Sequence, residues 1–88
     1  MKLVFKSSFE RDIKKIADKE LLSMIKNVIS NVEFADNVND IAHLRKLVNF
    51  KSFYRLKVKD YRIGLNIDNG TVYFVRFLHR KDIFRVFP

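Results

Sequence analysis

The chain has 88 residues, 48% of them hydrophobic, with nine Phe but only two Gly and one Pro; we therefore expect one folded domain over residues 1–88, and neither a second domain nor disorder. It has no Cys, which excludes a disulfide scaffold and a thiolate metal site and fits a reducing cytoplasm. It also has no apolar run near the ~18 residues of a membrane span, so we expect a cytoplasmic protein without a membrane partner. The formal net charge is +8, and the excess lies in residues 41–88, which contain eleven Lys or Arg and only three Asp. RNA, DNA or an acidic protein segment is therefore the expected partner. The alternative is a basic face that is only solvated.

The first forty residues predict a short strand followed by two helices. Val4 and Phe5 predict the strand. A helix is expected from Ser7, because Ser7 and Glu10 have the spacing of a capping box. Its apolar face would hold Phe9, Ile13, Ile16 and Ala17, and its solvent side Glu10, Arg11, Asp12, Lys14 and Lys15. A second helix from about Asp18 would carry one apolar stripe, made of Leu21, Leu22, Ile25, Val28, Ile29 and Val32. Only Ala17 and Asp18 separate the two helices, which predicts a helical hairpin.

The second half predicts strands joined by short turns. Residues 33–40 are polar and rich in Asn, which is typical of a loop. From Phe53 to Lys59, and again from Tyr61 to Ile67, apolar residues alternate with basic or polar ones, as in half-buried strands. Asp68-Asn69-Gly70-Thr71 predicts a tight hairpin, and residues 72–78 are apolar on both faces apart from Arg76, which favours a central strand. Residues 80–88 would form a helical turn.

The predicted fold is therefore α+β: a short N-terminal strand, a two-helix hairpin and an antiparallel meander, in the order βααβββ, with a short C-terminal turn or helix. The hairpin would cover one face of the sheet, and cations would occupy the other face.

That second face is the candidate site. If consecutive strands pair antiparallel, Arg55, Lys57 and Arg62 lie together, and His79-Arg80-Lys81 follows a neighbouring strand. Fixed cations suit phosphodiester cleavage because they stabilise the charge of the transition state. The carboxylates of this half, Asp60, Asp68 and Asp82, are too few and too scattered for a two-metal centre, so we expect no metal and no cofactor. The ribose 2′-hydroxyl would then be the nucleophile, which confines the reaction to RNA.

Proton transfer in such a site requires a base and an acid. His79 can serve as either near neutral pH, and Lys57, surrounded by cations, is the second candidate. The alternatives are a histidine that packs locally and a strand face that binds RNA, or is merely solvated, without cleavage. His43 has no partner in the sequence and is assigned no role.

Residues 54–64 (YRLKVKDYRIG) and 77–88 (FLHRKDIFRVFP), together with Leu44-Arg45-Lys46-Leu47 and the helical hairpin, resemble the RelE/ParE toxin superfamily over nearly the whole chain. Members share the predicted fold, and the RelE branch cleaves mRNA in the ribosomal A site. The resemblance therefore implies mRNA and the ribosome as partners. It also implies a RelB-like antitoxin, with a toxin-antitoxin heterotetramer among the assemblies that it allows.

The resemblance also implies roles for individual residues. By position, the cleaving residues of the RelE branch correspond to Arg55, Lys57, Arg62, Lys81 and Phe87. The family aromatic is usually Tyr, so Phe87 would only stack on a base, and His79 would carry the proton transfer. Lys46, Lys59 and Arg80 complete the expected RNA contacts, although Val48-Asn49 stands where a glycine often follows the Lys-Leu pair. A ParE-like toxin that inhibits a topoisomerase and an RNA-binding module that does not cleave remain the alternatives.

Overall fold

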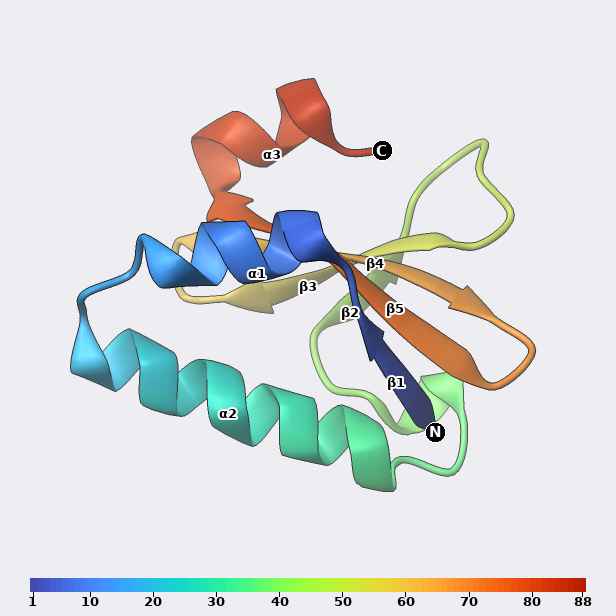
Figure 1. Cartoon of the computed structure of the whole chain (residues 1–88). Coiled ribbons are helices and arrows are strands. Elements are labelled where there is room, and N and C mark those ends of the chain that lie inside the picture. Colours follow the sequence, from blue (N-terminus) through green and yellow to red (C-terminus); the bar gives the residue numbers. More distant parts are fainter.

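The structure, a computed structural model, describes residues 1–88 and contains one five-stranded sheet with helices on both of its faces (Figure 1). The elements in chain order are β1 (Lys2–Phe5), α1 (Ser7–Lys14), α2 (Lys19–Phe34), η1 (Val38–Asp40), β2 (Leu44–Lys46), β3 (Phe53–Val58), β4 (Tyr61–Asp68), β5 (Thr71–His79) and α3 (Arg80–Val86). The predicted α+β class and βααβββ core are confirmed. No helix is both long and apolar enough to cross a membrane.

The strands lie in the order β1-β5-β4-β3-β2. The predicted meander of β3, β4 and β5 is antiparallel throughout, and β1 pairs with β5 in parallel. Two details differ from the prediction. The central strand is β4, with β5 beside it, and residues 44–46 form an additional edge strand, β2, paired with β3.

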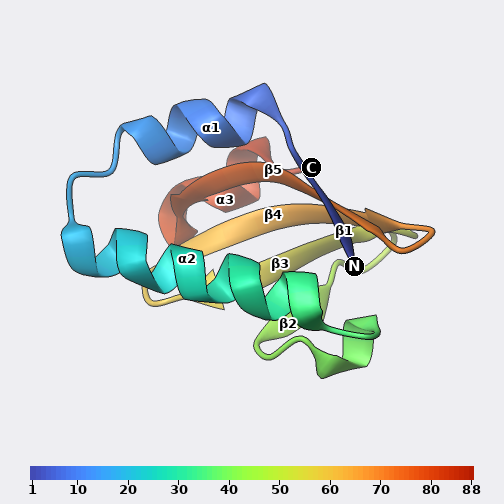
Figure 2. The same ribbon diagram turned by 60° about the horizontal axis from the view of Figure 1, so that its bottom comes forward.

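The main core lies between the sheet and the helical hairpin (Figure 2). Its fully buried side chains come from the apolar positions of β3, β4 and β5, for example Leu56, Ile63 and Phe74, and α2 adds Ile25 and Val32. The α2 helix begins after Asp18, whose side chain accepts a hydrogen bond from the backbone N–H of Leu21 at 3.1 Å. The predicted periodicity of this helix is confirmed.

The predicted start of α1 at Ser7 is confirmed, but the capping box and two helix ends were wrong. No side chain caps α1, because Ser7 is already helical and Lys6 holds the N-cap position. The same helix ends at Lys14, so residues 15–18 form the connection to α2, and Ile16 and Ala17 lie outside the helix. The α2 helix continues to Phe34, into the segment predicted to be a loop, and a turn of 3₁₀ helix follows at residues 38–40.

A second, smaller core lies on the opposite face of the sheet, where α3 packs. Its buried residues are Leu47, Ile83 and Phe87. Phe87 sits directly on β4 at Gly64, since a Cβ atom at residue 64 would lie 2.7 Å from the aromatic ring. The prediction that this face carries only cations was therefore incomplete, because α3 covers part of it.

Side chains of α1 also supply hydrogen-bond partners to backbone groups at an edge of the sheet. β1 pairs only with residues 71–74 of β5, so the last part of β5 pairs with β4 on one side and has no strand on the other. There, the Ser8 hydroxyl donates a hydrogen bond to the carbonyl of Val75, and Asp12 accepts one from the N–H of Phe77 at 2.9 Å. Asp12 also forms an ion pair with Arg76 at 2.7 Å. Asp12, expected to face solvent, is therefore buried.

Candidate functional site

The face of the sheet that carries α3 contains a hollow of about 850 Å³, which we call the basic hollow. Ten residues line it: His43, Leu44, Arg45, Lys46, Leu47, Val48, Arg55, Lys57, Arg62 and Phe84. Five of the ten are Lys or Arg, and none is a carboxylate. The hollow is thus a site of concentrated positive charge at the surface.

Strand register brings these cations together. Arg45 pairs with Arg55 across β2 and β3, and Lys57 pairs with Arg62 across β3 and β4. Residues directly opposite one another in a sheet project from the same face. The predicted convergence of Arg55, Lys57 and Arg62 is therefore what the structure shows. Lys46 of β2 also lines the hollow, although in the strand register it lies opposite Tyr54, which packs against the main core on the other face.

Two arginines are held in defined positions. Arg62 donates from Nη1 to the carbonyls of Lys59 and Tyr61, at 2.9 and 2.8 Å, which fixes its guanidinium near the turn between β3 and β4. The guanidinium of Arg55 stacks over the ring of Phe84, 4.3 Å from its centroid, and its Nε is buried without a hydrogen-bond partner. Burial and the neighbouring Arg62 lower the pKa of Arg55. Both effects disfavour the charged form, so an anion in the basic hollow would relieve them.

Lys59, expected to contact RNA, lies outside the basic hollow. It occupies the turn after β3 with a φ of 53°, and its Nζ forms an ion pair with Glu20 of α2 at 2.6 Å. That hydrogen bond raises the pKa of Lys59. The alternation that places Arg55 and Lys57 on the cationic face ends at Val58, and the turn directs Lys59 toward the helical hairpin.

His79 does not reach the basic hollow either. It pairs across the sheet with Tyr61, whose ring stacks on Phe77 of the main core at 4.9 Å, so the imidazole lies on the face opposite the cations. There it contacts the edge of Tyr61, and its Nδ1 accepts a hydrogen bond from the N–H of Lys81 at 3.1 Å. Its position is that of the N-cap of α3.

Replacing His79 with Ala is expected to destabilise the fold by about 1 kcal/mol, because α3 loses its N-cap acceptor. For a domain of this size, that corresponds to a fall of roughly 4–8 °C in Tm, measured by thermal unfolding. His79→Asn keeps an acceptor and should restore most of the loss. Equal destabilisation by Asn and Ala would show that the contact with Tyr61, and not the cap, is what matters.

The aromatic residue at the site is Phe84 rather than Phe87. Phe87 is only 4% exposed, packed on Gly64 and against the edge of Phe53, so the predicted stacking of Phe87 on a base is wrong. Phe84 is 66% exposed and lines the basic hollow. Arg80 and Lys81, in the first turn of α3, are exposed and do not line the hollow, but they lie one turn before Phe84 on the helix surface.

Sequence reasoning missed six of the ten lining residues, and three of the six carry a charged, titratable or aromatic side chain: His43, Arg45 and Phe84. His43 was assigned no role because it has no partner in the sequence, Arg45 was missed because β2 was not predicted, and Phe84 was missed because the tail was not assigned a helical period. The spacing of Ile83 and Phe87, four residues apart, was the available signal. On a helix it buries these two residues together and leaves Phe84 beside them at the surface.

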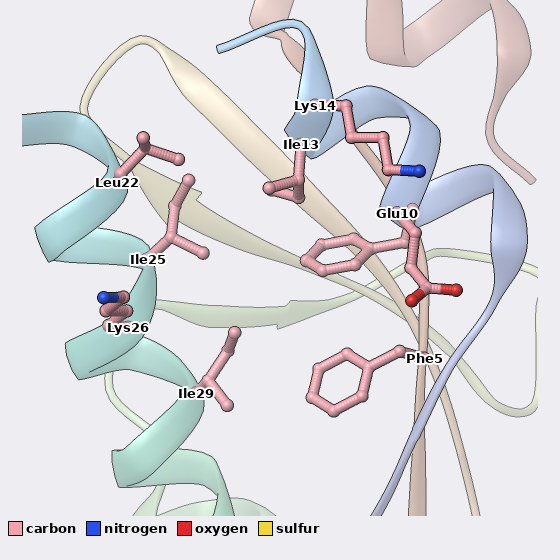
Figure 3. Close-up of a pocket in the computed structure, with 9 residues that line it drawn as sticks. Phe5, Glu10, Ile13, Lys14, Leu22, Ile25, Lys26 and Ile29 are labelled. Carbon is pink, nitrogen blue, oxygen red and sulfur yellow. The ribbon is translucent and has the colours of Figure 1, made fainter. Parts of the chain in front are cut away.

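A second hollow, of about 440 Å³, lies between α1 and α2. Figure 3 shows Phe5 and Ile13 on one side of it and Leu22, Ile25 and Ile29 of α2 on the other. The charged residues Glu10, Lys14 and Lys26 also belong to its lining. We call it the helix groove. It offers apolar surface and no cluster of groups suited to acid-base chemistry, so it suits binding rather than catalysis.

Comparisons with known proteins agree on one family. A model described as the ParE toxin of type II toxin-antitoxin systems, parDE, matches residues 3–84. Toxin RelE3 of Methanocaldococcus jannaschii is 33% identical over 89 aligned positions, which cover all of both chains. A chain in the crystal structure of the RelB-RelE antitoxin-toxin complex from Methanococcus jannaschii superposes with a TM-score of 0.80 at 30% identity, over 97% of this chain and 99% of that one. A chain of the YoeB dimer from Staphylococcus aureus shares the fold, with a TM-score of 0.72 at 16% identity over 90% and 95% of the two chains.

Proposed function

This chain belongs to the RelE/ParE family of toxins from type II toxin-antitoxin systems, and from that premise we propose that it inhibits translation by cleaving mRNA in the ribosomal A site. The proposed reaction is metal-independent and uses the 2′-hydroxyl of the RNA as the nucleophile. The basic hollow is the observation that carries the proposal.

The basic hollow fits the charge changes of this reaction. The 2′-oxygen forms a bond to phosphorus, the bond from phosphorus to the 5′-oxygen breaks, and a 2′,3′-cyclic phosphate results. Negative charge grows on the phosphate oxygens in the transition state, where Arg55, stacked on Phe84, and Arg62, bonded to backbone carbonyls, would stabilise it from fixed positions. Arg45 and Lys46 would hold the adjoining phosphates.

Two proton transfers complete the reaction: one removes the proton of the 2′-hydroxyl, and the other protonates the departing 5′-oxygen. Lys57 and His43 line the basic hollow and can exchange protons, so we assign these steps to them. We assign His79 no part in proton transfer, although the sequence suggested one, because its imidazole lies on the face of the sheet opposite the basic hollow. Lys81 and Arg80 would contact RNA that extends past Phe84.

An antitoxin is the proposed protein partner. The solved relative that is 30% identical was crystallised with RelB. A partner with an acidic segment would neutralise part of the net charge of +8 by covering the basic hollow. Apolar side chains of an amphipathic segment would fit the helix groove.

The test adds the purified protein to ribosomes paused with a defined codon in the A site and maps new 5′ ends by primer extension. We expect cuts within that codon, and none in the same mRNA without ribosomes. Equal cutting of naked mRNA would contradict dependence on the ribosome. No cut in any codon context, from protein shown to be folded by circular dichroism, would contradict cleavage itself.

The matching family model favours one alternative, because its description names ParE. A ParE-like toxin would inhibit a topoisomerase, and the basic hollow would then be an interaction surface. Inhibition of DNA supercoiling by gyrase, together with intact mRNA in the ribosome assay, would establish this alternative. RNA binding without either effect would indicate a module that binds but does not cleave.

A further inference from the structure

The α3 helix has seven residues and is anchored to the rest of the protein at both ends. A helix this short is not stable by itself in water, so outside contacts must hold it. At its start, the N–H of Arg80 donates a hydrogen bond to the carbonyl of Asp60, in the turn between β3 and β4, at 2.8 Å. Just after its end, Phe87 is buried on β4 together with Ile83. The height of Phe84 above the sheet, between these two anchors, therefore depends on how deeply Phe87 is seated.

Phe87 is seated in a notch that exists because residue 64 is glycine. A Cβ atom on Gly64 would lie 2.7 Å from the Phe87 ring, closer than such atoms approach in folded proteins. Phe53 of β3 packs beside the notch, with its ring edge-on to Phe87 and the centroids 5.6 Å apart. Gly64 has no positive φ, so close approach and not backbone conformation is what requires glycine here. A side chain at residue 64 would lift the ring, and with it the end of α3, away from the sheet.

The notch adjoins Arg55, one of the two arginines assigned to the transition state. Arg55 lies directly opposite Gly64 in the register of β3 and β4, so its side chain leaves the sheet on the same face as the notch. Arg55, Phe84 and Phe87 also line one cleft of about 700 Å³ beside the basic hollow. The guanidinium stacks on Phe84, and Nε is buried without a partner. Lifting α3 would take Phe84 off this guanidinium and open Nε to water.

We propose that Gly64 and Phe87 are positioning residues for cleavage, because they set the depth at which α3 lies on the sheet. At that depth, Phe84 holds the guanidinium of Arg55 in place. The inference rests on the proposed function, which places Arg55 at the reacting phosphate. Fixed cations stabilise developing charge better than mobile ones, because they need no reorganisation during the reaction. Loosening Arg55 should therefore lower kcat and leave the affinity for ribosomes nearly unchanged.

The first test exchanges volume between the two residues and measures cleavage on paused ribosomes. We expect Gly64→Ala to lower kcat by about 10- to 100-fold, as a displacement of about 1 Å can, with KM within about twofold. Adding Phe87→Leu to Gly64→Ala makes room for the new methyl group and should restore kcat to within about threefold. The matched control is Val32→Ala, which weakens the main core on the other face and should lose stability but no activity. All rates are measured at a temperature where thermal unfolding shows each variant to be folded.

The second test needs no ribosome. The Nε–H of a buried arginine exchanges slowly with water, so Arg55 should give a protected side-chain signal in proton–nitrogen NMR spectra, assigned by its absence in Arg55→Lys. Gly64→Ala should remove this protection, and the double variant should restore it. Protection that persists in Gly64→Ala, or is missing from the unmodified protein, would overturn the inference. So would a double variant as slow as Gly64→Ala, or a loss of kcat in Val32→Ala as large as in Gly64→Ala. If the unmodified protein cleaves nothing, the proposed function fails, and the NMR signal still decides whether Gly64 and Phe87 position Arg55.

Discussion

Lys57→Ala is expected to slow mRNA cleavage on paused ribosomes by about 10²- to 10⁴-fold, the range typical of losing a side chain that transfers a proton. Lys57 lines the basic hollow opposite Arg62. Lys59, two residues further on, is bound to Glu20 outside the hollow. Lys59→Ala removes the same charge from the chain and should leave the rate within about twofold. Single-turnover rates from primer extension measure both variants.

A third variant separates charge from proton transfer. Lys57→Arg keeps the positive charge but holds its proton too tightly to act as a base. We expect it to bind ribosomes as the unmodified protein does and to cleave as slowly as Lys57→Ala. A rate restored by Arg would show that Lys57 contributes charge alone, and proton transfer would then fall to His43.

The fold was predictable wherever apolar residues recur at one constant spacing along a long segment. The alternation in β3 and β4, and the apolar stripe of α2, each repeat several times and so identify both the element and its buried face. The three residues of β2 are too few to show a period, and their pairing with β3 creates the strand. The start of α1 at Ser7 was predictable, but its end at Lys14 was not, because the apolar residues Ile16 and Ala17 continue the helical spacing beyond the last helical residue.

The candidate site was predictable only in part, for related reasons. Arg55, Lys57 and Arg62 follow directly from strand register. Lys59 continues their alternation in the sequence, but a turn with positive φ removes it from the face. Whether Phe84 or Phe87 faces the site depends on the rotation of α3 about its own axis. That rotation is set by the close contact between Phe87 and Gly64, which local sequence does not reveal.

Asp12 shows how residue type can mislead where spacing does not. It lies three residues after Phe9, so the helical period places it on the buried side of α1. Its charge suggested solvent, because carboxylates are seldom buried unless they are paired. Here it is paired, with Arg76 and with the N–H of Phe77, both from the part of β5 that extends beyond β1 and has no strand on that side.

Asp12→Ala should therefore destabilise the fold by about 3 kcal/mol, measured by urea unfolding. The substitution leaves the N–H of Phe77 buried without an acceptor and Arg76 without its counter-ion. The value lies at the low end for a broken buried pair because the side chain of Arg76 is 30% exposed. Tm should fall by roughly 12–24 °C. Asp36→Ala, at an exposed position, is the matched control and should change the stability by less than about 0.5 kcal/mol.

Asp12→Asn distinguishes the two contributions. The amide oxygen can still accept a hydrogen bond from the N–H of Phe77, so this variant loses the ion pair and keeps the hydrogen bond to the edge of β5. We expect it to lose about half as much stability as Asp12→Ala. If Asn were as destabilising as Ala, the ion pair with Arg76 would account for the whole effect. The α1 helix would then be held to β5 by charge, and not by its role as a substitute for the missing strand.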